Sequence, residues 1–341
     1  KCISLYEHTW VLRLSEEIFL LNVKIGNKME TANLTVVKFF YLTELSDLPE
    51  VDTALFVVIL LIYLVTLAGN GAILLAIGTD VHLQTPMYFF LSNLSVLDVL
   101  CPTVTVPKML QIFLSGDKRI SFAGCVLQLF LIDVVGTEIY LLAVMAYDRY
   151  VAICSPLHYT NIMSKRLCAQ LAVGTWLTGF INSMVHTSLT FSLSFCGSNK
   201  INQYYCDLQP VTALSCSSTF LPELVRLLVA GITGGGAFLV TLISYIYIIS
   251  AILRMRSAEG RRKAFSTCGS HLTVVCLFYG ATIATYGCPV ASYSPKQDRI
   301  VSMLYGILTP MLNPLIYSLR NKEVKKALVK ALGLKRFEQM G

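Results

Sequence analysis

The stretch MAYDRYVAIC (residues 145–154) closes a long apolar segment and places an acid, an arginine and a tyrosine in a row. Charged side chains at membrane depth are costly and usually have a function. An arginine that extends its charge to the lipid headgroups would explain Arg149 but not the adjacent Asp148. We therefore expect a switch of Asp148, Arg149 and Tyr150, in which Asp148 holds Arg149 until a conformational change releases it.

The composition of the whole chain favours a membrane protein. Of its 341 residues, 55% are hydrophobic and only 14% are charged, far less charge than a soluble protein carries. Each helical crossing of a bilayer needs about 20 apolar residues. The predicted fold is therefore an all-α membrane protein, a seven-transmembrane helix bundle. Its helices are expected at residues 54–77, 87–106, 125–147, 167–188, 221–253, 265–286 and 300–317.

The basic residues predict the orientation. They concentrate after the third, fifth and seventh apolar segments, which places the N-terminus outside the plasma membrane and the C-terminus inside. The triplet Asn33-Leu34-Thr35 is a glycosylation acceptor on the expected outer side. A net charge of +7 could suggest nucleic acid, but the basic residues flank apolar segments, so we expect no nucleic-acid binding.

Two further carboxylates, Asp98 and Glu138, lie at membrane depth. Glu138 precedes Arg149 by eleven residues, about three helical turns, so the two share one face. Buried carboxylates need a partner or a cation. Either a shared sodium ion or a protonated, hydrogen-bonded pair would satisfy them, with Asn70 as a polar neighbour.

The last apolar segment contains Pro310 and Pro314, which remove backbone donors and bend the helix. Asn313 between them could bind a freed carbonyl.

The outer halves of two segments could line a cavity. Tyr279, Thr282 and Tyr286 share one helical face, and the third segment offers a second face with Gln128, Ile132, Val135 and Ile139. Such a cavity is apolar with a few hydroxyls and suits a small, mostly hydrophobic ligand. Aromatic packing between helices is the alternative for each tyrosine.

Signatures of enzymes are missing from the sequence. It contains no HExxH, GxSxG or P-loop string and no CxxC pair, so we expect neither an enzyme nor a cofactor. A small-solute transporter is less favoured because no symmetry between two halves is evident.

Longer strings occur in a characteristic order: PMYFFLSNLSVLD (86–98), MAYDRYVAICSPLHY (145–159), KAFSTCGSHL (263–272) and PMLNPLIYSLRNKEVKKAL (310–328). With them the chain resembles a vertebrate odorant (olfactory) receptor of the rhodopsin-like G-protein-coupled family. The resemblance implies binding of small hydrophobic odorants and activation of a heterotrimeric G protein of the stimulatory olfactory type, which raises cyclic AMP. A rhodopsin-like receptor for a lipid or a peptide is the alternative.

The resemblance also implies residue roles. Arg149 would engage the G protein, and the remaining switch residues would be Tyr245, His271, Asn313, Pro314 and Tyr317. Asp98 and Glu138 match an acidic pair proposed to hold sodium. Disulfides would join Cys125 to Cys206 and Cys196 to Cys216. The ligand-facing positions would be Ile132, Val135, Ile139, Val229, Thr233, Tyr279, Thr282, Tyr286 and Gly306.

One spacing departs from the family. Cys125 and Arg149 are 24 residues apart, one fewer than the resemblance implies. A missing residue turns the outer part of the helix by about 100° relative to the inner part. A local π- or 3₁₀-type adjustment could absorb the difference.

We expect four regions along the chain. Residues 1–28 are an extension outside the family core, 29–53 an extracellular tail, 54–317 the receptor domain and 318–341 a cytoplasmic tail. In this last part Val324, Leu328 and Leu332 recur at four-residue spacing among lysines. That pattern predicts a short amphipathic helix on the membrane lipids, with a frayed basic tail as the alternative.

Overall fold

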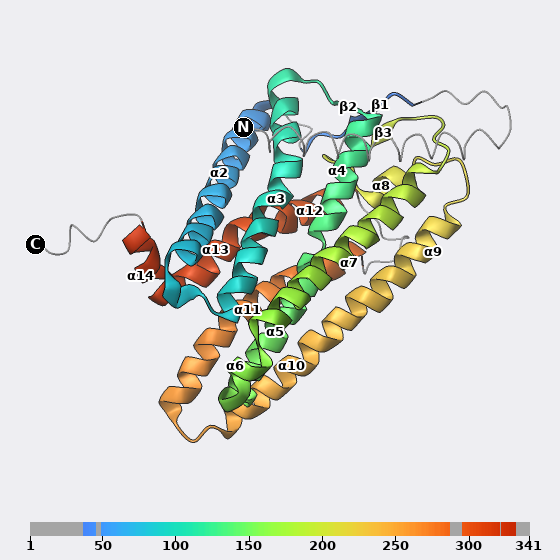
Figure 1. The fold of residues 1–341 in the computed structure, drawn as a ribbon. Coiled ribbons are helices and arrows are strands. Elements are labelled where there is room, and N and C mark those ends of the chain that lie inside the picture. The colour runs from blue at the N-terminus through green and yellow to red at the C-terminus, as the bar shows by residue number, and fades with distance from the viewer. Residues whose placement is uncertain (1–36, 46–48, 287–294, 321, 332–341) are drawn as a thin grey trace, which may run out of the picture.

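The computed structural model describes residues 37–45, 49–286, 295–320 and 322–331, and Figure 1 shows their arrangement. Within them, seven long helical segments form a bundle, as the sequence predicts. They are α2 (Pro49–Thr79), α3 (Pro86–Ser115), α4 (Phe122–Val135) with α5 (Glu138–Cys154), α7 (Lys165–Phe191), α9 (Phe220–Val229) with η3 (Ala230–Gly234) and α10 (Gly235–Arg254), α11 (Ala258–Tyr286), and α12 (Pro295–Met303) with η5 (Leu304–Leu308) and α13 (Thr309–Arg320).

Short elements connect these helices. They are η1 (Val81–Leu83), η2 (Pro156–His158), α6 (Tyr159–Ile162), α8 (Leu208–Thr212) and α14 (Lys322–Ala331), with strands β1 (Phe39–Leu42), β2 (Arg119–Ser121) and β3 (Lys200–Ile201). Five helical stretches are long and apolar enough to cross a membrane, namely 52–79, 86–115, 122–154, 220–254 and 299–317. The segment α7 is less apolar and carries Asn182, Ser183 and His186, whose polar side chains bond neighbouring helices.

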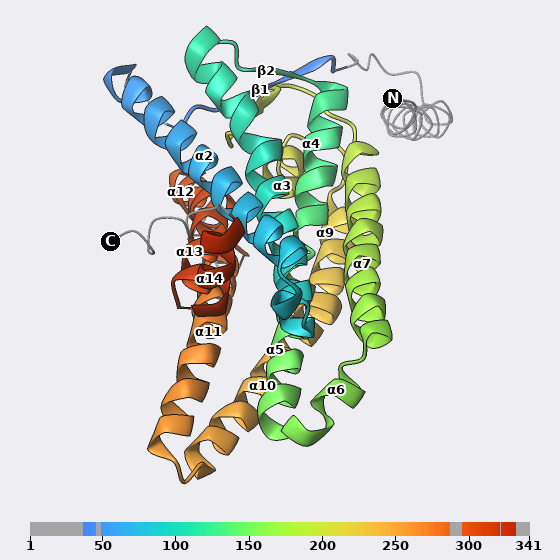
Figure 2. The same cartoon turned by 60° about the vertical axis from the view of Figure 1, so that its left-hand side comes forward.

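The two ends of the bundle differ in construction. One end, here called the disulfide end, holds both disulfides and a small sheet in the order β2-β1-β3. In the sheet Phe40 pairs with Ile120 and Tyr41 pairs with Lys200. The opposite end, here called the Arg149 end, holds α6 and α14, and Figures 1 and 2 place these far from the sheet. The sheet was not anticipated from the sequence, because its strands have only two to four residues.

Local signals fix several helix ends. Ser121 begins α4 by accepting a hydrogen bond from the Gly124 backbone N–H at 3.0 Å. Ser164 begins α7 in the same way through Leu167, at 3.3 Å. The segment α3 ends at Gly116, whose φ of 68° is a left-handed conformation that favours glycine.

The tail helix α14 packs against α2, as Figure 2 also shows. Val324 and Ala327 are buried, whereas Lys326 is exposed. This pattern agrees with the predicted amphipathic helix; Leu332 lies outside the described residues.

A tight turn separates α4 from α5. Four backbone hydrogen bonds of 3.0–3.2 Å span three residues instead of four, at Gly136, Thr137, Ile139 and Tyr140. A 3₁₀ turn advances about 120° per residue where an α-helix advances about 100°. About five such residues add about 100° of rotation, which is the rotation that the missing residue between Cys125 and Arg149 would have supplied. Their larger rise per residue also makes up for the helix length that the missing residue would have supplied. The structure therefore places the 3₁₀-type adjustment at Gly136–Thr137.

Candidate functional site

Arg149 is buried at the Arg149 end of α5, with only 7% of its surface exposed. Its charge acts on three buried residues of other helices: Tyr245 of α10, His271 of α11 and Tyr317 of α13. The structure thus brings four of the predicted switch residues together. Tyr150, next in sequence, packs its ring 5.7 Å from Tyr247 of α10.

Tyr245 and His271 form a polar contact between α10 and α11. The Tyr245 Oη lies 2.7 Å from His271 Nδ1, and the two rings stack with centroids 5.8 Å apart. His271 is fully buried. Among the described residues, its Nε2 and the Tyr317 Oη have no hydrogen-bond partner. This cluster can therefore rearrange without breaking an ion pair.

The Asp148–Arg149 pair of the predicted switch is open in this structure. In the described part of the chain no ion pair joins these side chains. Asp148, 2% exposed, instead accepts a 2.8 Å hydrogen bond from the Tyr159 hydroxyl of α6. Burial raises the pKa of the Tyr159 phenol, and the Asp148 carboxylate adds to this, so the phenol stays a donor. The structure therefore describes a state in which Arg149 is already free of Asp148.

The two carboxylates deeper in the bundle lie near Asn313. The Asn313 side-chain amide donates to Asp98 Oδ1 at 2.8 Å, and Glu138 lies close to both. Asp98 Oδ2 and Glu138 Oε1 remain buried and, among the described residues, without a partner. The donor set of two carboxylates and an amide suits a monovalent cation as well as a shared proton.

The prolines of α13 require a correction. Pro314 cannot donate to the carbonyl of Pro310, and Asn70 of α2 takes that carbonyl at 3.1 Å. Pro310 likewise frees the carbonyl of Gly306, which accepts from the Cys101 thiol at 3.5 Å. The prediction that Asn313 binds a freed carbonyl was wrong, because the Asn313 amide donates to Asp98 instead.

The predicted ligand-facing residues fall into two packed clusters in the described part of the chain. Ile132 packs with Tyr204 and Tyr205 of the loop before α8. Ile139 and Tyr279 belong to the main core, where the Tyr279 ring lies 5.2 Å from that of Phe238. In this structure Tyr279 therefore packs between helices, which was the alternative to a ligand-facing position.

The remaining ligand-facing positions are placed as follows. Val135 is buried, and a side chain at Gly306 would meet Tyr204 of the loop. Thr233 donates to the Val229 carbonyl at 2.7 Å. The side chains of Thr282 and Tyr286, and all of Asn33, lie outside the described residues.

The loop between α7 and α9 covers the disulfide end. Disulfides join Cys125 to Cys206 and Cys196 to Cys216, with Cα atoms 5.5 and 5.8 Å apart. Gln128, expected on the cavity face, instead accepts from the Cys206 backbone N–H at 2.9 Å and donates to the Val104 carbonyl at 3.0 Å. It fixes the loop to α3 and α4.

Sequence reasoning missed two polar contacts between α7 and its neighbours. Asp133 Oδ2 lies 2.9 Å from His186 Nδ1. Asn182 donates to the Tyr140 hydroxyl at 2.7 Å, and Tyr140 contacts the Thr233 hydroxyl at 2.8 Å. Asp133 is a charge at membrane depth, the same signal that singles out Asp98, so the sequence alone could have identified it.

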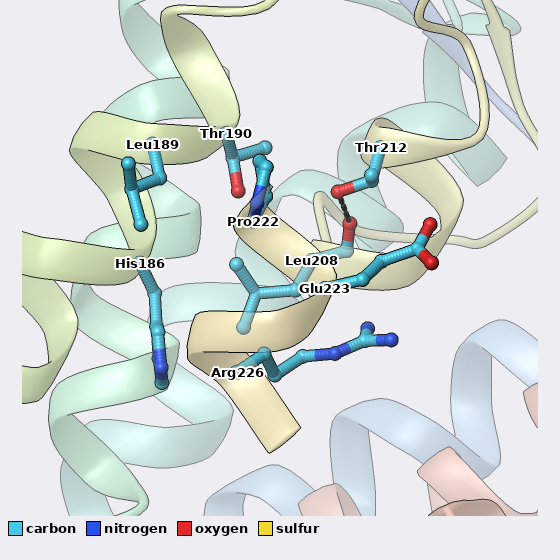
Figure 3. Close-up of a pocket in the computed structure, with 8 residues that line it drawn as sticks. All are labelled: His186, Leu189, Thr190, Leu208, Thr212, Pro222, Glu223 and Arg226. Carbon is cyan, nitrogen blue, oxygen red and sulfur yellow. Dashed lines mark hydrogen bonds between the residues drawn. The ribbon is translucent and has the colours of Figure 1, made fainter. Parts of the chain in front are cut away.

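A hollow lies beside His186 at the disulfide end. It is a small space between α7, α8 and α9. Figure 3 shows His186 on one side, Thr190 and Thr212 above, and Glu223 and Arg226 on the far side. It is lined by His186, Leu189, Thr190, Leu208, Thr212, Pro222, Glu223 and Arg226.

Comparisons with known proteins agree with this architecture. Residues 59–335 match the family described as Olfactory receptor. Olfactory receptor 5AR1 of Mus musculus is 49% identical over 308 residues, which cover 90% of this chain and 99% of that protein. Olfactory receptor 5B21 of Homo sapiens is 51% identical over 301 residues, 88% of this chain and 97% of that protein. Among solved structures, squid rhodopsin matches with a TM-score of 0.65 and 19% identity, over 85% of this chain and 87% of that one.

Proposed function

Because this chain belongs to the olfactory receptor family, we propose that it binds small hydrophobic odorants and activates a stimulatory heterotrimeric G protein that raises cyclic AMP. It is a multi-pass membrane receptor with the rhodopsin-like fold and not an enzyme. The odorant would bind at the disulfide end, between the third, fifth and sixth helical segments. The G protein would bind at the Arg149 end.

The observation that carries this proposal is the state of Arg149. Arg149 is buried beside Tyr245, His271 and Tyr317, while Asp148 bonds Tyr159. An odorant that binds better to this arrangement than to one with Asp148 on Arg149 would increase its population. The G protein would then engage Arg149 in a cleft between the inner ends of α5, α10 and α11.

The expected orientation of the chain in the membrane supports the proposal. Disulfides persist in an oxidising environment, so the disulfide end would face outward, as Asn33 also suggests. The Arg149 end would face the cytoplasm with its basic loops and α14, whose lysines would contact membrane lipids.

A sodium ion would suit the two deep carboxylates. Asp98 Oδ2 and Glu138 Oε1 are buried acceptors without a partner among the described residues, and Asn313 donates to the other Asp98 oxygen. If the ion binds one signalling state better than the other, odorant affinity in the parent receptor changes with sodium concentration. Odorant affinity that is the same in sodium and in choline buffers would argue for a shared proton instead.

A cyclic AMP assay in heterologous cells with an odorant panel tests the proposed function. The parent receptor is expected to respond, and Arg149→Ala is expected to lose the response at equal surface expression. Arg119→Ala, the same exchange at an exposed site of the disulfide end, is the control. A fully active Arg149→Ala would overturn the switch. Odorant-dependent uptake into vesicles without a G-protein response would indicate a transporter instead.

A further inference from the structure

A groove of about 600 Å³ lies on the outer surface of the bundle, between α3, α4 and α7. It is lined by Phe89 and Asn93 of α3, Val134 of α4 and one face of α7 from residue 169 to residue 180. Val173 and Leu177 of that face are exposed, so the groove opens away from the bundle. Because α3 and α4 belong to stretches that are long and apolar enough to cross a membrane, the groove opens toward lipid.

The polar groups of the groove already have partners. Trp176 Nε1 donates to Asn93 Oδ1 at 3.0 Å, and Asn93 Nδ2 donates to the Phe89 carbonyl at 2.9 Å. The other side chains that line the groove are apolar. A polar group inside it would therefore lose its hydrogen bonds to water without replacing them, whereas a hydrocarbon chain would lose nothing.

The length of the groove matches one leaflet of a bilayer. Ala169 and Phe180 are eleven residues apart, about 16 Å along the helix, and half of a hydrocarbon core is about 15 Å. The groove starts one turn inside α7 at the Arg149 end and reaches Val134, beside the turn in the middle of the third helical segment. It therefore follows the path of one acyl chain from the headgroup level to the middle of the bilayer.

Two basic side chains lie at the mouth of the groove. Lys165 and Arg166 begin α7, four residues before Ala169 and seven before Val173, so helical periodicity places both on the groove face. Both are exposed, and in the described part of the chain neither forms an ion pair. A negatively charged headgroup complements them. A sterol, whose polar group is an uncharged hydroxyl, would leave both charges unpaired.

We propose that this groove binds an anionic phospholipid. One acyl chain lies along α7 against Trp176, and the headgroup pairs with Lys165 and Arg166. The inference goes beyond the proposed function and uses its membrane orientation only to assign the lipid to the inner leaflet.

Trp176 can report on the lipid directly. The chain has two tryptophans, Trp10 and Trp176, so Trp10→Phe leaves only the groove tryptophan. The purified full-length receptor is placed in nanodiscs of phosphatidylcholine that contain a small fraction of phosphatidylserine, phosphatidylcholine or a sterol carrying bromine, which quenches tryptophan fluorescence on contact. Brominated phosphatidylserine is expected to quench with about five- to thirtyfold higher affinity than brominated phosphatidylcholine, the range for one or two basic residues beside an anionic lipid.

Removing the two charges tests the headgroup contact. Lys165→Gln combined with Arg166→Gln is expected to abolish the preference for phosphatidylserine. The control is Arg254→Gln combined with Arg256→Gln, which removes two exposed charges at the same end of the bundle beside α10. This control is expected to keep the preference, because α10 packs against α5 and does not line the groove.

Filling the groove tests the acyl-chain contact. Ala169→Phe places a ring in the groove and keeps both charges, so a chain bound in the groove is displaced and the preference is expected to disappear. Gly174→Phe adds the same ring to α7 outside the groove, where space is open, and is expected to keep the preference.

Equal quenching by the two phospholipids would overturn the proposal, and so would an anionic preference that survives in Ala169→Phe, since that reports only general attraction to the basic loop. Stronger quenching by the brominated sterol would make a sterol the occupant. No quenching by any of the three would mean that protein, such as a second copy of the chain, covers the groove. None of these results depends on odorant or G protein, so a missing cyclic AMP response contradicts the proposed function alone.

Discussion

The two ends of the bundle satisfy their polar groups in different ways. At the Arg149 end, Tyr245, His271 and Tyr317 lie within electrostatic range of Arg149, and Arg149, His271 and Tyr317 belong to recognisable strings in the sequence. At the disulfide end the contacts join residues outside such strings, for example Gln128 with Cys206. At this end, the packing of the loop between α7 and α9 and the tight turn at Gly136–Thr137 determine which side chains come into contact.

The difference shows what can vary while the family's mechanism is kept. If the G protein binds at the Arg149 end, as proposed, that end must present a fixed surface to it. If the odorant binds at the disulfide end, that end must fit a particular ligand, and specificity arises from differences among affinities. The tight turn at Gly136–Thr137 separates these two regions within one helical segment.

Inserting one residue gives the largest expected effect. An alanine inserted between Gly136 and Thr137 is expected to preserve odorant-evoked cyclic AMP, because the 3₁₀ turn can relax into an α-helix. An alanine inserted between Leu142 and Ala143 is expected to abolish it, because the helix on one side of the insertion turns by about 100°. If both insertions reduce odorant-evoked cyclic AMP equally at equal surface expression, the proposed role of the turn is contradicted.

The next largest effect is expected where the turn at Gly136–Thr137 contacts α7. A side chain at Gly179 would collide with Thr137 Oγ1. Gly179→Ala is therefore expected to destabilise the receptor by about 1–3 kcal/mol, measured as a lower Tm in nanodiscs. Gly174→Ala on the same helix, with open space around it, is the control. Adding Thr137→Ala should restore most of the loss; an unchanged Tm in Gly179→Ala would break the account of this contact.

Much of this architecture could be predicted from the sequence. Seven apolar segments predicted the bundle, Arg149 and His271 were recognised within longer strings, and Tyr245 followed from the family resemblance. The Tyr159 partner of Asp148 was not predicted, because Tyr159 comes from a loop whose path no local pattern specifies. Tyr279 could not be separated from core packing, because a tyrosine on a helix face fits either environment.

Partner choice across helices failed for the same reason. Asn313 was expected on a freed carbonyl, yet Asn70, 240 residues from Pro310, takes it. Such contacts depend on the rotation of one helix against another, which hydrophobic periodicity fixes only coarsely. The sheet of β1, β2 and β3 was missed because such short strands carry almost no pattern.

The proline carbonyl offers a smaller test at the Arg149 side of the bundle. Asn70→Ala leaves the buried Pro310 carbonyl without its side-chain donor, at a cost of about 1–3 kcal/mol. Pro314→Ala returns a backbone N–H that can reach this carbonyl, so Asn70→Ala should cost less in that background. Tm values of the four receptors form the double-mutant cycle, and strictly additive losses would rule out the contact.

The smallest effect is expected at the exposed rim of the disulfide end. The hydrogen bond from Arg119 lowers the pKa of Asp117 to about 2, below its ordinary value of 3.8. The resulting stabilisation is present above pH 4 and is lost as pH falls toward 2. Asp117→Asn should lower Tm slightly at pH 7, less in high salt and less below pH 4. A difference that stays constant with pH and salt would mean that charge plays no part.

The central claim is that the two ends are coupled through the state of Arg149. Coupling is reciprocal, so a G protein bound at the Arg149 end must change odorant affinity at the disulfide end. The direct measurement is odorant affinity of the purified receptor with and without nucleotide-free stimulatory G protein. We expect about 5- to 150-fold tighter binding in the parent and no change in Arg149→Ala. The same affinity with and without G protein in the parent would contradict the account.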